Sequence, residues 1–266
     1  MTALDFSVEP GSAAEVTGRE EGRGYVRETW RIAGSQGEAV AADTYLSAGP
    51  GPVVIGCHGK DDSRKAQYLR GPAVHWAARG ISLVAIDAPL HGERSGERPV
   101  PEITITDLDL LTRWVRDHRL LVDAVEARFG PGVPIAFLGM SMGAVMGCHL
   151  MAAEPRFAAG ILVVGGSTVR SVPKWFEDAG GMGELLALTD PRLPAGRIAP
   201  RPVLMLNADD DSVFSRGSAL DLYDALAPPK EITFFPGGHA RWRSPAQWHR
   251  RMLRFLEDTV GGRASP

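Results

Sequence analysis

The sequence predicts an α/β fold, in which a mostly parallel central sheet is covered by helices on both faces. Short apolar runs without alternation recur along the chain, as expected for strands buried on both faces. Amphipathic stretches long enough for helices separate these runs. The pattern continues past residue 150, so we expect one domain over residues 1–266 with a single core.

The N-terminal part has a different pattern. Residues 1–20 are rich in Gly, Glu and Ala, and we expect a loosely ordered lead-in there. Two further runs, Tyr25–Ile32 and Glu38–Leu46, are separated by glycines and predict a short antiparallel pair.

The alternating part begins after residue 50. The predicted parallel strands are Pro52–Cys57, Ile81–Ile86, Val133–Leu138, Gly160–Val164, Pro202–Leu206 and Glu231–Phe235. The predicted helices are Gln67–Arg79, Asp107–Phe129, Met142–Ala153, Ser215–Leu226 and Pro245–Val260. Large apolar side chains recur every three or four residues in Asp107–Phe129, and Gly130 ends that helix. Residues 168–200 interrupt the alternation and form an insertion.

Composition excludes several classes of protein. The chain has 29 basic and 32 acidic residues with interspersed signs, so we expect no nucleic-acid partner. Two cysteines form no disulfide framework. Since the sequence shows neither a signal-peptide pattern nor 18 consecutive apolar residues, we expect a cytoplasmic protein without a membrane partner. The sequence does not indicate the oligomeric state.

Ser141 is the candidate nucleophile. It lies in Gly139-Met140-Ser141-Met142-Gly143, between a predicted strand and a predicted helix. A turn of this kind forces the serine into a strained, exposed conformation, and small residues two positions before and after it avoid clashes. The alternative is a tight turn with an incidental serine.

A serine hydroxyl needs a base, and His239 is the candidate because it follows a strand in a glycine-containing loop. The base in turn needs a carboxylate, and Asp209, Asp210 and Asp211 follow the strand Val203–Leu206. The order Ser, Asp, His is typical of this triad on such sheets. Some of these aspartates are also expected to cap the helix that starts near Ser215.

These motifs resemble the α/β-hydrolases, and among them the small dienelactone-hydrolase-like and prolyl-oligopeptidase-like esterases, over residues 50–260. The ordered motifs are His58-Gly59, Asp87–Gly92, Gly139–Gly143, the aspartate cluster and Gly237–His239. The family's acid motif, Gly-x-x-Asp-x-x-Val, aligns with Asn207–Val213 and implies Asp210 as the carboxylate. Asn207 replaces the usual glycine, so Asp209 remains open.

The resemblance also implies an oxyanion hole formed by the backbone N–H groups of Met142 and Lys60. It implies that His58 braces a loop, and that the Asp87–Gly92 loop either does the same or brings His91 into contact with substrate. The insertion falls where these proteins carry a cap, the alternative being a helical excursion with a small core of its own. The remaining pocket candidates are Trp175, Phe176 and Trp242, although packing is an equal alternative for Trp242.

Together these residues predict a serine hydrolase that cleaves a small-molecule carboxylic ester or lactone through an acyl-enzyme on Ser141, without a cofactor. Dienelactone hydrolases proper use a cysteine nucleophile, whereas Cys57 and Cys148 here are expected to serve packing. The alternative is a cyclase, lyase or acyltransferase on the same scaffold, or a binding module with an idle triad. A metal site built from His58, Asp61, Asp62 and His91 matches no common ligand spacing.

Overall fold

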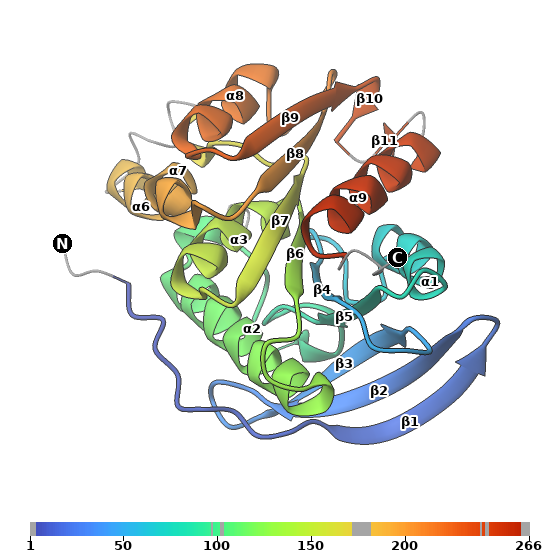
Figure 1. Ribbon diagram of the computed structural model, residues 1–266. Coiled ribbons are helices and arrows are strands. Elements are labelled where there is room, and N and C mark those ends of the chain that lie inside the picture. The colour runs from blue at the N-terminus through green and yellow to red at the C-terminus, as the bar shows by residue number, and fades with distance from the viewer. Residues whose placement is uncertain are drawn as a thin grey trace.

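The computed structural model describes residues 4–96, 98–101, 104–171, 182–239, 241–242 and 245–261. Within these ranges a nine-stranded sheet has the order β1-β2-β3-β5-β4-β6-β7-β8-β9 (Figure 1). Its strands are β1 (Glu15–Gly22), β2 (Tyr25–Ala33), β3 (Ala39–Leu46), β4 (Val53–Cys57), β5 (Ser82–Ile86), β6 (Ile135–Met140), β7 (Phe157–Val163), β8 (Val203–Ala208) and β9 (Lys230–Phe235). A small hairpin follows, formed by β10 (Gly237–Gly238) and β11 (Arg241–Trp242).

The main helices are α1 (Gln67–Ala77), α2 (Leu108–Phe129), α3 (Met142–Ala153), α8 (Arg216–Ala225) and α9 (Pro245–Thr259). Shorter ones are α4 (Thr168–Ser171), α6 (Met182–Thr189), α7 (Arg192–Ala195) and the 3₁₀ turns η1 (Gly92–Arg94), η2 (Thr104–Thr106) and η3 (Gly196–Ile198). The predicted Asp107–Phe129 helix is confirmed as α2. Asp107 caps it, because its side chain accepts the N–H of Leu110 at 3.0 Å.

The strands β4 to β9 are mutually parallel, whereas β1, β2 and β3 join the sheet in antiparallel fashion. The chain leaves β4 toward β5 on one side and returns to β6 on the other. This reversal places a crevice at the C-terminal end of β4, where ligands bind in open α/β sheets. The segments that follow β4, β6, β8 and β9 therefore meet at one edge.

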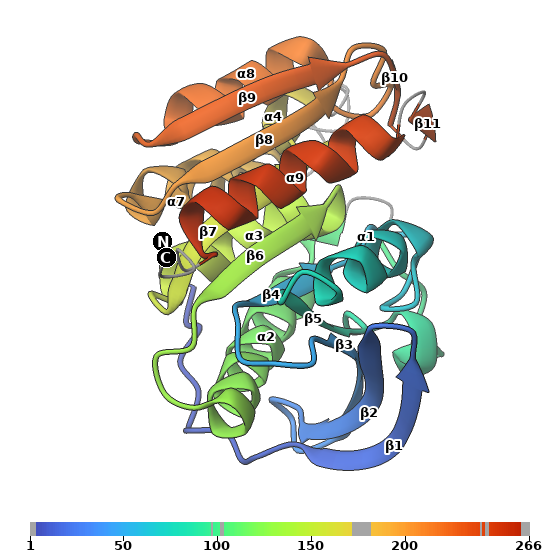
Figure 2. The ribbon, with the colours of Figure 1, turned by 45° about the vertical axis from the view of Figure 1, so that its right-hand side comes forward.

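Helices cover both faces of the sheet, α1 and α9 on one and α2, α3 and α8 on the other (Figure 2). Val53 and Ile55 pack in the core that includes Trp114 of α2, while Val54 between them packs with Trp76 of α1. Because both faces of β4 and β6 are buried, these two central strands consist of apolar residues and glycine. The predicted α/β class is confirmed.

The expected loose lead-in over residues 1–20 is wrong from residue 15 onward, because Glu15–Gly22 forms the edge strand β1 against β2. Nearly all of its side chains are exposed, so the sequence carries no apolar alternation there. Pairs of polar side chains on β1 and β2 stabilise the pairing of these two strands instead. Arg19 lies opposite Glu28 and forms an ion pair with it at 2.9 Å.

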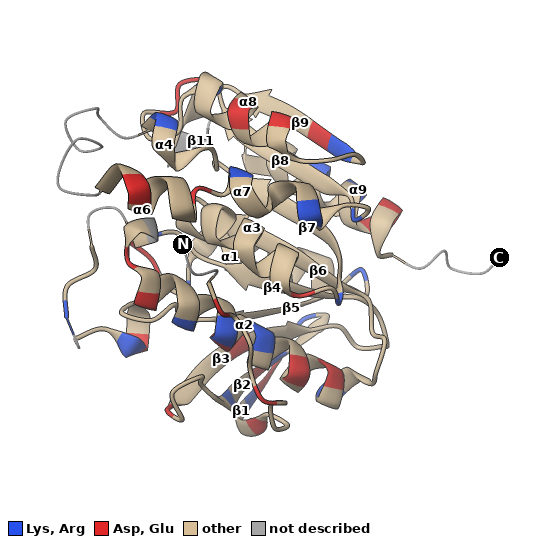
Figure 3. Cartoon of the chain, turned by 90° about the vertical axis from the view of Figure 1, so that its left-hand side faces the viewer, with Lys and Arg blue, Asp and Glu red and all other residues tan. Residues whose placement is uncertain are grey.

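The described part of the insertion packs beside α3 and α8, and charged residues of both signs are coloured along the chain on this side of the molecule (Figure 3). Leu186 of α6 is fully buried against Val145 and Phe214. Asp190 fastens the segment to the end of β7 by accepting hydrogen bonds from Ser167 Oγ at 2.9 Å and from the backbone N–H of Val169 at 3.0 Å.

Trp175 and Phe176 lie outside the described residues, so the cap itself remains a prediction. Among the helices that the structure does describe, none is both long and apolar enough to span a bilayer.

Candidate active site

Ser141 lies on the sharp turn between β6 and α3, and its backbone has φ +52° and ψ −110°. This conformation is strained for a residue with a side chain. The flanking glycines permit the turn: a Cβ on Gly139 would lie 2.4 Å from the carbonyl oxygen of Gly143, and one on Gly143 would lie 2.7 Å from that of Cys57. The strained serine conformation predicted from the motif is confirmed.

His239 lies beside Ser141, although 98 residues separate them in the chain. Its Nε2 is 2.8 Å from Ser141 Oγ, and its Nδ1 lies 3.0 and 2.9 Å from the two carboxylate oxygens of Asp211. Because an ionised carboxylate only accepts, this geometry places the ring proton on Nδ1 and leaves Nε2 to accept from the serine hydroxyl. The ring of Phe214 packs 5.9 Å from the imidazole.

The carboxylate next to His239 belongs to Asp211, which corrects the prediction of Asp210 with Asp209 as the alternative. Strand β8 extends to Ala208, two residues beyond the predicted end. The backbone N–H groups of Asp209 and Asp210 then bond to the carbonyls of Phe235 and Gly237, both at 2.9 Å, while their side chains stay exposed.

Asp211 is the first of the three to turn inward. Its side chain is fully buried, and its Oδ1 also accepts the backbone N–H groups of Val213 and Phe214, each at 2.8 Å. These two bonds fix the carboxylate in place against the imidazole. Asp209 instead forms an exposed ion pair with Arg216 at 3.2 Å.

The turn after β4 lies directly against the nucleophile, since a Cβ on Gly59 would be 3.6 Å from Ser141 Cβ. The Gly59 N–H donates to the hydroxyl of Tyr68 at 2.9 Å. Burial raises the pKa of Tyr68, which keeps the phenol neutral. Lys60 follows on the same turn, and Met142 is the first residue of α3. Tyr68 is not recognisable from the sequence, because one tyrosine in a helix carries no distinguishing pattern.

His58 and His91 hold the neighbouring loops. His58 Nδ1 lies 2.7 Å from the Gly59 carbonyl, and its Nε2 accepts the N–H of Ala88 at 2.9 Å. Burial lowers the pKa of His58 to about 4. His91 is buried with its Nδ1 2.8 Å from the Pro89 carbonyl, and it does not line the cleft beside Ser141, which corrects its choice as a pocket residue.

No group of three or more His, Cys, Asp or Glu side chains within the described ranges is arranged to hold a metal ion.

A cleft of about 1010 Å³ opens beside Ser141, between α1 and the start of α9. It is lined by Gly59, Lys60, Asp61, Asp62, Gln67, Tyr68, Gly71, Met140, Ser141, Val213, His239, Pro245 and His249. The described residues of the insertion take no part in this lining. Trp242 contributes the backbone of β11, and its side chain lies outside what the structure describes.

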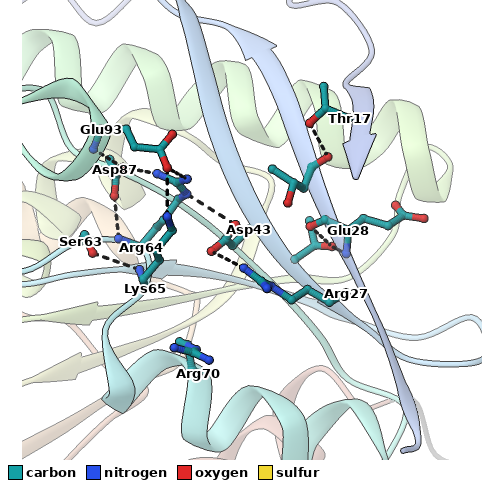
Figure 4. Close-up of polar contacts among 12 residues, drawn as sticks. Thr17, Arg27, Glu28, Asp43, Ser63, Arg64, Lys65, Arg70, Asp87 and Glu93 are labelled. Atoms are coloured by element: carbon teal, nitrogen blue, oxygen red, sulfur yellow. Dashed lines mark hydrogen bonds and ion pairs between the residues drawn. The ribbon is translucent and has the colours of Figure 1, made fainter. Parts of the chain in front are cut away.

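A buried ion network anchors the loop that carries Gly59 (Figure 4). Arg64 is 3% exposed, and its guanidinium pairs with Asp87, with Glu93 at 2.6 Å and with Asp43 at 3.6 Å. Its backbone N–H also donates to Asp87 at 2.8 Å. Asp43 pairs further with Arg27 at 3.4 Å. Arg64 thus connects the loops after β4 and β5 to strand β3.

This architecture, with a serine on a strained turn and a histidine and aspartate at the same sheet edge, is that of an α/β-hydrolase. A family model described as serine aminopeptidase, S33 matches residues 48–201, which is more than half of the chain, and the chain belongs to this family of α/β-hydrolases. The matched range includes Ser141 and ends before Asp211 and His239. The expected superfamily is confirmed, whereas the dienelactone-hydrolase-like subfamily stays a prediction.

The chain is also similar to solved structures of esterases. A PEG-bound cold-adapted esterase from an Arctic intertidal metagenomic library is 24% identical, with a TM-score of 0.72 over 92% of this chain and 99% of that one. The acetyl xylan esterase from Paenibacillus sp. R4 is 18% identical, with a TM-score of 0.76 over 93% and 88%. At these identities the likeness shows the fold. A search of curated proteins finds no match.

Buried histidines should make stability depend on pH. Burial lowers the pKa of His118 to about 3 and that of His58 to about 4. Below about pH 6.5 the unfolded chain binds protons on these rings that the folded chain does not, so acid favours unfolding. Between pH 6.5 and 5 we expect each ring to cost about 2 kcal/mol of unfolding free energy. Urea titrations at pH 7 and pH 5 measure the loss, and His118→Phe should lose about 2 kcal/mol less than the wild type. Equal losses in the wild type and in His118→Phe would contradict the lowered pKa of His118.

Removal of Arg64 should destabilise the fold. Arg64→Met leaves Asp87 and Asp43 buried without this guanidinium, and we expect a loss of about 3–5 kcal/mol in urea unfolding. Arg70→Met is the matched control, since the side chain of the exposed Arg70 makes one hydrogen bond within the described ranges, to the Tyr45 hydroxyl at 3.1 Å. It should cost about 1 kcal/mol or less. A similar loss in both variants would show that the network does not depend on Arg64.

Proposed function

We propose that the protein is a serine hydrolase that cleaves a carboxylic ester through an acyl-enzyme on Ser141. The observation that carries the proposal is the unbroken hydrogen-bond chain from Asp211 through His239 to Ser141 Oγ. The strained serine opens on a cleft large enough for a small-molecule substrate. Esterases among the solved structures with this fold support the choice of an ester.

In the first step Ser141 Oγ attacks the acyl carbon while His239 Nε2 takes its proton. The imidazolium that forms is stabilised by the Asp211 carboxylate at Nδ1. The negative charge moves to the former carbonyl oxygen. When the tetrahedral intermediate collapses, the carbon–oxygen bond of the alcohol breaks, and His239 returns the proton to the leaving oxygen.

In the second step a water molecule attacks the acyl-enzyme. His239 takes the proton of this water, and a second tetrahedral intermediate forms. Its collapse breaks the bond to Ser141 Oγ, which recovers its proton from His239, and the carboxylic acid leaves. The same imidazole therefore acts once as base and once as acid in each step.

The oxyanion is assigned to the backbone N–H groups of Met142 and Lys60. Met142 begins α3, so its amide is one of the first N–H groups of the helix. These groups have no carbonyl partner within the helix. They also lie at the positive end of the helix dipole. The Gly59–Lys60 turn lies directly against the serine. The Tyr68 hydroxyl already accepts the Gly59 N–H, which makes Lys60 the donor of choice on this turn.

Ser141→Ala should reduce ester hydrolysis by about a thousandfold or more, because the nucleophile is lost. The measurement is kcat/KM for methyl acetate and p-nitrophenyl acetate, with circular dichroism as the control for folding. A fluorophosphonate should label the wild type at Ser141 and leave the variant unlabelled. An undiminished rate in Ser141→Ala would contradict the mechanism. Faster cleavage of an aminoacyl p-nitroanilide than of any ester would contradict the substrate class.

Three aspartate variants test the orienting carboxylate. Asp211→Asn should lower kcat by about 10⁴, because the amide favours the wrong imidazole tautomer. Asp210→Asn and Asp209→Asn are matched controls with exposed side chains, and we expect both to stay within about twofold of the wild type. A large loss in Asp210→Asn with a small one in Asp211→Asn would overturn the assignment.

A further inference from the structure

The cleft contains two polar side chains that the proposed mechanism does not use. Gln67 begins α1, and His249 lies in the first turns of α9 on the opposite wall. Neither side chain has a hydrogen-bond partner among the described residues. The two converge at Gly71: a Cβ built there would lie 3.5 Å from Gln67 Nε2 and 3.9 Å from His249 Cε1.

Gly71 has no side chain and leaves a hollow open between the side chains of Gln67 and His249. Pro72 follows it within the helix, and a residue with a Cβ before proline is disfavoured in the helical conformation. Glycine relieves that clash and, as a result, presents bare backbone to the cleft. The hollow is therefore bounded by an amide, an imidazole and the ring of Tyr68, all of which line the same cleft.

The chemistry of the hollow favours neutral groups that both donate and accept hydrogen bonds. The Gln67 amide has both functions, and so has a neutral imidazole. Burial, reinforced by nearby His75, lowers the pKa of His249, so the ring is neutral at pH 7. Asp61 and Asp62 are exposed at the rim and disfavour an anion. Hydroxyl groups match this lining, because each one donates and accepts.

We propose that Gln67 and His249 form a subsite for the alcohol portion of the ester, and that this portion carries hydroxyl groups. The proposal rests on the proposed ester hydrolysis. The leaving oxygen has to lie within reach of His239, and Pro245 and His249 of α9 line the same cleft as His239. The subsite therefore lies on the leaving-group side, and the substrate class is an ester of a small polyol.

Glycerol 1-monoacetate and propyl acetate test the proposal, since both carry a three-carbon alcohol and only the first carries free hydroxyls. Methyl acetate is the reference substrate, because its alcohol portion carries no group that could reach the subsite. The wild type should prefer the glycerol ester in kcat/KM by about fivefold, the value of about one hydrogen bond. His249→Phe and Gln67→Leu should each remove most of this preference and leave methyl acetate within about twofold.

Gln247→Leu on α9 is the matched control. It makes the same change as Gln67→Leu at an exposed position outside the cleft lining, and it should keep the preference. A wild type that does not prefer the glycerol ester overturns the subsite, and so does a preference that survives in His249→Phe and Gln67→Leu. A preference for methyl glycerate over methyl propionate with none between the two acetates overturns the assignment to the alcohol portion.

A binding measurement separates this proposal from the proposed function. The proton NMR signal of the His249 ring, identified by its absence in His249→Phe, should shift when glycerol is added to the wild type and shift less in Gln67→Leu. If all esters remain uncleaved while this shift occurs, the ester hydrolysis is wrong and the polyol subsite stands. If esters are cleaved and the His249 signal does not respond, the subsite is wrong and the hydrolase stands.

Discussion

The close approach of two turns is the constraint on which the site depends. The β6–α3 turn packs so tightly against the end of β4 that a Cβ on Gly143 would lie 2.7 Å from the Cys57 carbonyl and 2.9 Å from that of His58. This contact requires glycine and fixes the strained conformation of Ser141. It also brings the Gly59–Lys60 turn next to the serine. One backbone contact thus sets both the nucleophile and the turn that faces it.

Buried polar groups hold the loops around that contact. His58 joins the loops after β4 and β5 through two backbone groups, and Arg64 joins the same loops through Asp87. Loops at the edge of a parallel sheet lack the regular hydrogen bonds of the strands, so side chains must satisfy their backbone. The charges in this network are paired, which is the condition for burying them. Rigidity at the site therefore comes from its supporting loops as well as from the sheet.

The cleft combines two kinds of surface with different origins. Its reactive end is built from the ends of β4, β6, β8 and β9, where the topology brings strand termini together. Its other wall is formed by α1 and α9, which cover one face of the sheet (Figure 2). The side chains that these helices present to the cleft lie outside the buried faces that pack on the sheet. In this chain they present Gln67 and His249.

The sequence by itself determined the α/β class, the buried strands, the main helices and the strained serine turn, because these follow from local periodicity and from the spacing of glycines. It also predicted that His239 follows a strand at the active edge. Tertiary structure decided the rest. Asp211 is the carboxylate beside His239 because β8 pairs with β9 as far as Ala208. The edge strand β1 forms because its residues pair with polar partners in β2. Tyr68, Gln67 and His249 meet the site only because α1 and α9 pack on the same face. Such contacts join residues far apart in the chain, where local pattern carries no information.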